Sequence, residues 1–305
     1  MGWLSLNSSV GTDKGQNKSR DIKIAQALLN VYLRREKKAA LKLTTKINKE
    51  TNQTITNFQS KELNRSKPDG RIDPGGGTYK ALIKVLKASH TTAAIVEPSY
   101  GIVTWNSEGT EGGIYHSRKL HVPGSASGLT LGRGYDFRRK KQATIIANLT
   151  TAGVDAKIIT VLKNAAGLYG NTAKQFIIDN DLLDFQIQPN VQKKLFKISY
   201  EYEASQVKRI STKKDVVKLY GICDWDKLHS GIKDMAVDLK FRGDYTANSR
   251  KFLQQPIADN DLETFKKEII NKSNWPGVPA DRFKRRKDYI EKQKTKAATP
   301  TSPKQ

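Results

Sequence analysis

A glycine-rich run between Thr104 and Phe137 restricts the fold of this chain more than any other part of its sequence. Gly128, Gly132 and Gly134 lie so close together that a long helix is disfavoured, because glycine lacks a Cβ and weakens helices. Their spacing predicts short strands joined by tight turns. The segments after this run carry helical periodicity instead. The sequence therefore predicts an α+β fold that is mainly helical and has a small strand-bearing lobe.

The composition describes a globular chain with a large excess of positive charge. Of its 305 residues, 37% are hydrophobic and 28% are charged, which is enough apolar material for two domains. With 54 lysines and arginines against 30 aspartates and glutamates, the formal net charge is +24. This excess predicts attraction to a polyanion such as the bacterial envelope, nucleic acid or anionic lipid. The alternative is a solvated lysine-rich surface without a dedicated partner.

Neither the cysteine nor the histidines indicate a metal or cofactor site. Cys223 is the only cysteine, so no disulfide can form within the chain, and its apolar neighbours predict a buried structural thiol. Gly132 and Gly134 lack the third glycine of a dinucleotide-binding loop. We therefore expect no metal and no cofactor. The histidines, none of them at a spacing typical of zinc ligands, are His90, His116, His121 and His229.

The sequence shows no targeting segment. Its first residues carry no basic region followed by an apolar run, so we expect no ordinary signal peptide. No apolar stretch is long enough to span a bilayer, so we expect no membrane insertion. A chain of this kind that works outside the cytoplasm needs another export route.

Helical periodicity and a proline-containing linker predict two domains. The first helical domain covers residues 1–90, the linker covers 91–99, the second domain covers 100–291, and a disordered basic tail covers 292–305. In the first domain, helices are expected over residues 21–33, 48–63 and 79–87, with Thr78 as the N-cap of the third. In the second domain, helices are expected over residues 140–152, 155–168, 172–178, 188–206, 229–241, 246–257 and 262–271, with a last helix from Arg282.

The first domain carries three short motifs, Gln26–Asn30, Thr54–Gln59 and the turn-rich loop Pro68–Thr78. Together they resemble the peptidoglycan-binding domain of bacterial cell-wall enzymes, over residues 8–88. The resemblance implies a three-helix repeat that binds wall glycan. The family's Asp-Gly loop between the first two helices is replaced here by Lys46–Thr51, and a structural appendage is the alternative.

Two carboxylates and a hydroxyl frame the glycine-rich run. Cleavage of a glycosidic bond needs a proton donor and a second group that activates water or stabilises positive charge. Glu108 follows an apolar segment, so partial burial is expected to raise its pKa and keep it protonated. Asp136 precedes Arg138 and Arg139, whose charges are expected to keep it ionised, and Thr130 is able to bind a water. Glu111, also followed by glycine, competes with Glu108 for the role of acid.

The order of residues in this run adds a second resemblance. Glu108-Gly109, Tyr115 and Leu129–Tyr135 resemble the pattern of phage-type lysozymes, and Ser127–Asp136 is similar to the pesticin-like lysozyme domains. The stretches Asp238–Thr246 and Val278–Arg286 also look like the helical lobe of that family, so the resemblance spans most of residues 100–291.

The resemblance implies roles for particular residues. Glu108 is then the general acid, Thr130 positions water and Asp136 is the second carboxylate. Phage lysozymes carry an aspartate where Gly124 stands here, so Asp136 must supply that charge from the other side of the turn. The predicted substrate contacts are Tyr115, His121, Tyr135 and Arg133.

The implied function is a muramidase that cleaves the β-1,4 bond between N-acetylmuramic acid and N-acetylglucosamine. Such a chain is an antibacterial effector or a phage-type lysin that acts in the periplasm or on the wall of target bacteria, and an effector implies a cognate immunity protein. The expected partner is bacterial peptidoglycan, and no nucleic acid is expected. The alternatives are chitosan or chitin as substrate, or an inactive protein that binds wall or nucleic acid. Arg282, Arg285 and Arg286 either meet acidic groups of the wall peptides or face solvent.

Overall fold

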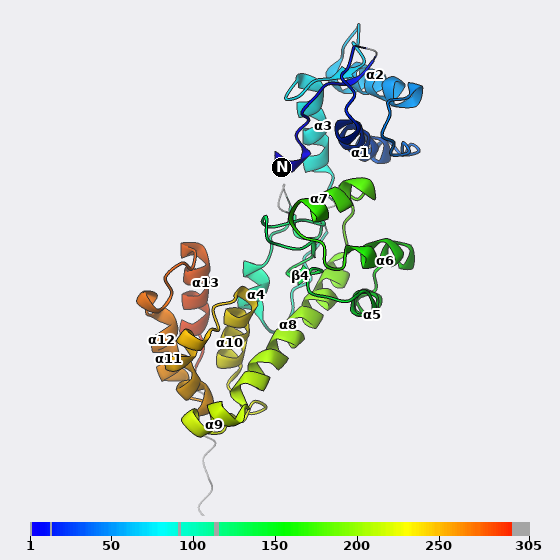
Figure 1. The fold of residues 1–305 in the computed structure, drawn as a ribbon. Helices are drawn as coiled ribbons and strands as arrows, with labels where there is room; N and C mark the ends of the chain where they lie inside the picture. Colours follow the sequence, from blue (N-terminus) through cyan, green and yellow to red (C-terminus); the bar gives the residue numbers. More distant parts are fainter. Residues whose placement is uncertain (1, 13, 91–92, 113–115, 295–305) are drawn as a thin grey trace, which may run out of the picture. The chain divides into compact units, whose positions relative to one another are not determined.

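The computed structural model describes residues 2–12, 14–90, 93–112 and 116–294 (Figure 1). Within these residues thirteen α-helices carry most of the chain, and the strands are only two residues long. The expectation of a mainly helical α+β fold is thereby confirmed.

The chain folds into two compact units that are not consecutive in sequence. The first unit contains residues 1–96 and 109–195, and the second contains residues 97–108 and 196–305. Helix α8 (Pro189–Ser211) contributes its first residues to the first unit and the remainder to the second. The two units are defined by which residues pack together in the folded chain. The domain boundaries expected around residues 90 and 100 stay a prediction.

The three predicted N-terminal helices are present in the first unit, with ends that differ by a few residues. Strand β1 pairs antiparallel with β2, and the ring of Tyr32 meets Phe58 edge-on at 4.9 Å between centroids. Thr78 was expected to be the N-cap of α3, but it is not. It is buried, and its Oγ1 accepts a 3.0 Å hydrogen bond from Gln59, while Gly76 occupies the cap. The elements are β1 (Val10–Gly11), α1 (Ser19–Arg35), α2 (Lys49–Leu63), β2 (Arg71–Ile72) and α3 (Gly77–Ala88).

The rest of the first unit contains the later part of the glycine-rich run and the helices that follow it. Its long predicted helix over residues 155–168 ends at Leu162 and continues as a short 3-10 helix, η3. Ala166 then leaves helical geometry and Gly167 adopts a φ of +78°, which ends the helix. The elements are β3 (Thr130–Leu131), β4 (Tyr135–Asp136), α5 (Gln142–Ala152), α6 (Ala156–Leu162), η3 (Lys163–Ala165) and α7 (Gly170–Asp179).

An arginine fork fastens helix α1 to the loop after α7 inside the first unit. The guanidinium of Arg34 donates to Asp181 at 2.6 Å and to Asp184 at 2.6 and 2.8 Å. Asn30, one turn earlier, donates to Asp181 at 2.9 Å. These charge-assisted bonds join the N-terminal helices to residues that are distant in sequence, so the N-terminal helices are not merely tethered by a linker.

Replacing Arg34 with methionine is expected to loosen this attachment. The change should lower the free energy of unfolding by about 1 kcal/mol, because the pairs are charge-assisted but partly exposed. Hydrogen exchange should speed up in the loop that carries Asp181. Arg35→Met is the matched control, since Arg35 pairs with Glu62 within the N-terminal helices. Equal exchange in the two variants would contradict the proposed anchoring role.

The second unit is a bundle of helices around one apolar core. Trp105 of α4 packs edge-on against Phe196 of α8, and Cys223 is buried, as expected of a structural thiol. Helix α9 was not predicted from the sequence. The segment before Glu108, for which no helix was predicted, forms helix α4. The elements are α4 (Ile102–Ser107), α9 (Lys214–Tyr220), α10 (Ser230–Arg242), α11 (Ala247–Ala258), α12 (Leu262–Ile270), η4 (Lys272–Asn274) and α13 (Ala280–Glu291).

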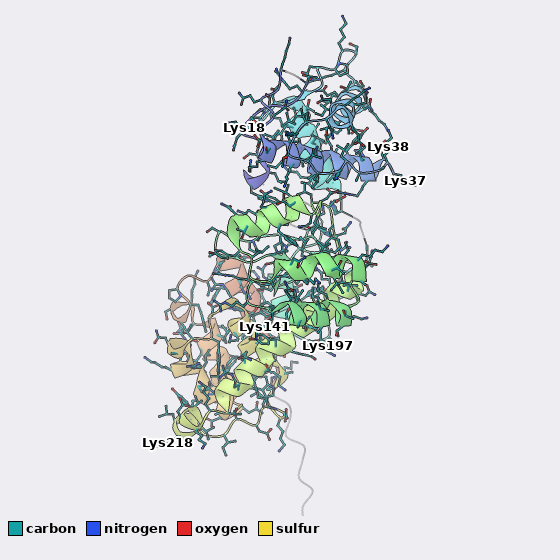
Figure 2. The ribbon with its side chains drawn as sticks, turned by 45° about the vertical axis from the view of Figure 1, so that its right-hand side comes forward. Lys18, Lys37, Lys38, Lys141, Lys197 and Lys218 are labelled. Carbon is teal, nitrogen blue, oxygen red and sulfur yellow. The ribbon has the colours of Figure 1, made fainter. Side chains whose placement is uncertain are left out.

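The excess lysines are exposed and distributed over many elements. The labelled side chains in Figure 2 include Lys18 before α1, Lys141 before α5 and Lys218 on α9, and all three are exposed. The positive charge is therefore spread along the chain, which suits diffuse attraction to a polyanion. In the part of the chain that the structure describes, no helix combines the length and apolar character needed to cross a membrane.

Candidate functional site

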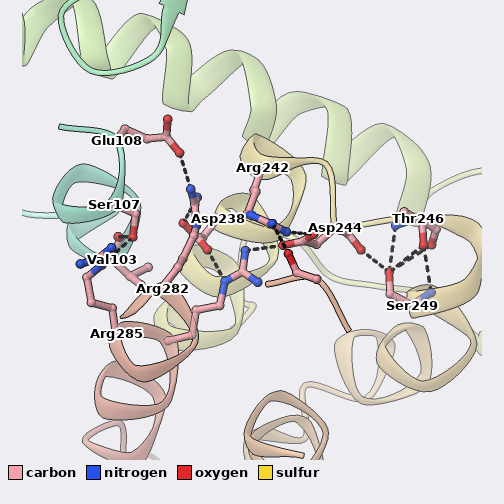
Figure 3. Close-up of polar contacts among 12 residues, drawn as sticks. Val103, Ser107, Glu108, Asp238, Arg242, Asp244, Thr246, Ser249, Arg282 and Arg285 are labelled. Atoms are coloured by element: carbon pink, nitrogen blue, oxygen red, sulfur yellow. Dashed lines mark hydrogen bonds and ion pairs between the residues drawn. The ribbon is translucent and has the colours of Figure 1, made fainter. Parts of the chain in front are cut away.

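Glu108 lies at the C-terminal end of α4 in the second unit. Its backbone N–H closes the helix by donating to Thr104 O at 2.9 Å, and its side chain is 21% exposed. Arg282 of α13 donates to Oε1 at 2.7 Å (Figure 3). Oε2 has no hydrogen bond to the described residues, so one carboxyl oxygen is held in place and the other is available to a ligand.

Glu108 is the first member of a chain of ion pairs that continues into the second unit. The ion-pair chain consists of Glu108, Arg282, Asp238, Arg286, Asp244 and Arg242, with alternating charges (Figure 3). Asp238 is fully buried and receives Arg282 at 2.7 Å and Arg286 at 2.6 Å. Such a chain holds each guanidinium in one orientation, because every pair fixes the next.

Two of the three arginines of α13 differ from both expectations. Arg282 and Arg286 neither face solvent nor remain available for acidic groups of the wall, since both are buried and paired with carboxylates of the protein. Arg285 is 37% exposed and pairs with Asp281, while its Nε donates to Ser107 at 3.3 Å.

The pKa of Glu108 is raised, as the sequence suggested. Burial is the main cause, since it disfavours the charged carboxylate, and the nearby charge of Asp238 acts in the same direction. Arg282 opposes both effects because its cation favours the ionised form. The net effect is a raised pKa, which shifts the carboxyl toward the protonated form that a general acid needs.

Thr130 and Asp136 face each other on a two-stranded hairpin in the first unit. Strands β3 and β4 pair antiparallel with Thr130 opposite Asp136, and the turn between them contains Gly132 and Gly134, with φ values of +63° and +83°. This confirms the expected strands and tight turn. Glycine stands at the two turn positions because other residues rarely adopt such φ angles.

The Asp136 carboxylate is fixed by the backbone. Its Oδ1 accepts a 2.6 Å hydrogen bond from the backbone N–H of Arg138 and lies so close to Gly128 that a Cβ there would clash with it. The guanidinium of Arg138 points elsewhere, lying 4.6 Å from the centroid of the Tyr169 ring. The carboxylate is thus bound by a backbone donor and is half-buried, while the ammonium of Lys140 donates to the backbone O of Asp136 at 2.6 Å.

His121 lies next to Thr130, while the hydroxyl of Thr130 has a single weak contact. The backbones of these two residues exchange hydrogen bonds of 2.8 and 3.0 Å. Thr130 Oγ1 donates to Gly128 O at 3.3 Å and can accept a further bond. Burial lowers the pKa of His121, so its half-buried ring is neutral near pH 7.

Two of the predicted substrate contacts are directed into the protein. Tyr135 is 1% exposed, packs edge-on against Phe137, and accepts a hydrogen bond from Asn148. Arg133 is buried and donates to Gly109 O at 2.5 Å. We therefore assign neither side chain a substrate contact. Tyr115 lies outside the described residues.

Glu111, the rival acid, is a countercharge inside the first unit. Its carboxylate accepts a 2.9 Å hydrogen bond from Arg118, which is 1% exposed, and lies 3.6 Å from Arg133. His116 is 3.5 Å away, and burial together with the Arg118 charge lowers its pKa to about 4. Glu108 and Glu111 thus have different surroundings: one oxygen of Glu108 has no hydrogen bond to the described residues, whereas both oxygens of Glu111 lie near guanidinium groups.

The comparisons with known proteins identify a family. Residues 101–287 match the model of a family described as a domain of unknown function, DUF8812. This range is more than half of the chain, so the chain belongs to that family. It contains Glu108, Thr130 and Asp136 together with the ion-pair chain. No curated protein matches the chain.

Sequence reasoning missed the partners of Glu108. Asp238 was quoted only as part of a family-like stretch, although it stands beside Val237 and Leu239, which are buried in α10. A charged residue in such a run indicates a buried partner of opposite charge. Arg282 and Arg286, four residues apart on one helix face, are suitable partners.

No group of histidine, cysteine and carboxylate side chains among the described residues is able to hold a metal ion.

Proposed function

We propose that this chain is a peptidoglycan hydrolase of the lysozyme type. The observation that carries the proposal is the state of Glu108: its pKa is raised by burial, and Arg282 holds one of its oxygens while the other has no bond to the described residues. The order of residues in the glycine-rich run, which resembles phage-type and pesticin-like lysozymes, supports the same function.

In this proposal the protonated Glu108 donates its proton to the glycosidic oxygen as the bond to the anomeric carbon breaks. Asp136 is the second carboxylate, and Thr130 positions the water whose oxygen joins the anomeric carbon. The water supplies one proton to restore the acid, so the reaction consumes one water and leaves the enzyme unchanged.

The same proposal assigns a domain type to each part of the fold. Helices α1–α3 are then a peptidoglycan-binding module, and the hairpin and the later helices are the small and helical parts of a lysozyme-like domain. The substrate is the bond between N-acetylmuramic acid and N-acetylglucosamine. Delivery as an antibacterial effector, with action in the periplasm and a cognate immunity protein, extends the proposal, and a phage-type lysin is the alternative source.

Product analysis on three polymers tests the proposal. Incubation with purified peptidoglycan is expected to release fragments with reducing N-acetylmuramic acid ends, and chitosan should remain intact. Degradation of chitosan or chitin alone would instead show that the substrate is wrong. Salt-sensitive binding to DNA without any cleavage of wall would favour the inactive, nucleic-acid-binding alternative.

The pH dependence of the reaction is expected to report the raised pKa of Glu108. A general acid is active when protonated, so activity should fall as the pH rises through the folded-state pKa of Glu108. Because that pKa is raised, the fall should come at a pH above 4.5, the ordinary value for glutamate. The measurement is kcat/KM on soluble glycan fragments against pH. A profile whose alkaline limb lies below pH 4.5 would contradict this role.

A further inference from the structure

The second unit contains a cavity of about 520 Å³ that the hydrolase proposal does not use. Its lining includes Ser99 and Tyr100, which precede α4, whereas Glu108 is at the C-terminal end of that helix. A volume of this size is typical of small-molecule sites. The lining residues that matter here are Tyr100, Tyr200, Tyr289, Glu201, Lys233 and Asp234.

The buried carboxylate of Asp234 fixes two of the three tyrosines. It accepts hydrogen bonds from the hydroxyl of Tyr200 and, at 2.7 Å, from that of Tyr289, and it also accepts the backbone N–H of Gly101 at 3.0 Å. Tyr100 packs against Tyr200 with 5.0 Å between ring centroids. The aromatic lining is thus held in place before any ligand arrives, which reduces the entropic cost of binding.

The charge of the lining has the opposite sign to that of the chain. Glu201 and Asp234 contribute two negative charges and Lys233 one positive charge, although the whole chain carries +24. The Lys233 ammonium lies 5.4 Å from the centroid of the Trp225 ring, which partly engages it. Glu201 forms an ion pair with Lys197 at 3.6 Å, and both side chains are exposed, so this pair is weak.

The tyrosines remain neutral at physiological pH. Burial, together with the charge of Asp234, raises the pKa of both Tyr200 and Tyr289. Burial also raises the pKa of Tyr100 to about 12, with Glu201 adding to the effect. Neutral phenol rings beside carboxylates are a combination that recognises organic cations, because the ring face carries negative potential.

We propose that this cavity binds a small organic cation bearing an ammonium group, held by the tyrosine rings and by the negative charge of Glu201 and Asp234. The proposal does not depend on the hydrolase activity, since the cavity excludes Glu108. A free ammonium group is found on amino sugars, amino acids and alkylamines, and the cavity has room for such a molecule. Binding of an anion through Lys233 is the opposite outcome, and the Lys233→Met variant distinguishes the two.

Titration with choline, followed by NMR or calorimetry, tests the proposal on the full chain. The neutral isostere 3,3-dimethylbutan-1-ol is the ligand control, because it keeps the shape and loses the charge. Wild-type protein is expected to bind choline saturably and to bind the alcohol at least about 5-fold more weakly, as expected of a cation–π site. The same titration of Glu108→Gln should give an unchanged affinity, which separates this site from the hydrolase proposal.

Three variants complete the test, and two of them change the charge of the lining in opposite directions. Glu201→Gln removes a negative charge from an exposed side chain and should weaken choline binding by about 3- to 5-fold. Lys233→Met removes the competing cation and keeps the aliphatic stem, so it should strengthen binding by a similar factor. Tyr100→Leu should weaken it by about 3- to 5-fold through loss of the ring. Reversed effects of the two charge variants, equal affinity for the alcohol, or no saturable binding would each reject the proposal.

Discussion

Replacing Glu108 with glutamine is expected to abolish wall hydrolysis and to leave the folded protein intact. Glutamine keeps the size and the acceptor oxygen that meets Arg282 but has no acidic proton. Loss of a general acid typically lowers kcat by about 100- to 10,000-fold. The measurement is the release of reducing ends from peptidoglycan, with thermal unfolding of the same samples.

The stability of this variant follows from the pKa of Glu108. Its folded-state pKa is raised, so its stabilising contribution is fully present below the unfolded value and is lost as the pH rises through the folded value. At pH 7 the ionised carboxylate is therefore less favourable in the folded state than in the unfolded state. A neutral glutamine removes this difference, and the Tm of Glu108→Gln at pH 7 should equal or exceed that of the wild type.

Glu111→Gln is the matched control, with the opposite expected pattern. Glu111 is a countercharge of Arg118, which is 1% exposed, so neutralising it removes a negative charge from beside a buried guanidinium. The free energy of unfolding should fall by about 3 kcal/mol, while the protein that remains folded keeps its activity. If Glu111→Gln were inactive with an unchanged Tm and Glu108→Gln stayed active, Glu111 would be the acid.

The helices and the hairpin could be predicted because their signals are local. The spacing of apolar residues located most helices, and the steric freedom of Gly132 and Gly134 located the turn. Helix α9 escaped prediction because it is short and Leu219 on it is 72% exposed, so it lacks a clear apolar face. Thr78 was misplaced as a cap because a buried partner, Gln59, competes for its hydroxyl.

The surroundings of the candidate acid could not be predicted, because they depend on residues far apart in the sequence. Arg282 reaches Glu108 across 174 positions and Asp238 across 44 positions. Composition and periodicity carry no information on such pairings. For the same reason the ion pair of Arg34 with Asp181 was not predicted. Tyr135 was expected to contact the substrate, but its side chain is buried in the core.

Asp238→Asn is expected to produce the largest loss of stability among the variants considered. Asp238 has no exposed surface and receives charge-assisted bonds from both Arg282 and Arg286. Neutralising it leaves two buried guanidinium groups with less countercharge, and breaking a buried pair in this way costs about 3–5 kcal/mol. Urea unfolding measures the loss. Asp281→Asn is the control, because it makes the same chemical change at an exposed residue of α13 and should leave unfolding unchanged.

The same variant also tests whether the ion-pair chain tunes the acid. The charge of Asp238 raises the pKa of Glu108, so its removal should lower that pKa. Below the unfolding temperature, the alkaline limb of the kcat/KM profile should then move to lower pH in Asp238→Asn and stay in place in Asp281→Asn. A loss of stability without this movement would mean that Asp238 supports the fold alone. Movement of the limb in the expected direction would show that the ion-pair chain sets the protonation of Glu108, because a purely structural aspartate has no reason to change the titration of a residue that it does not contact directly.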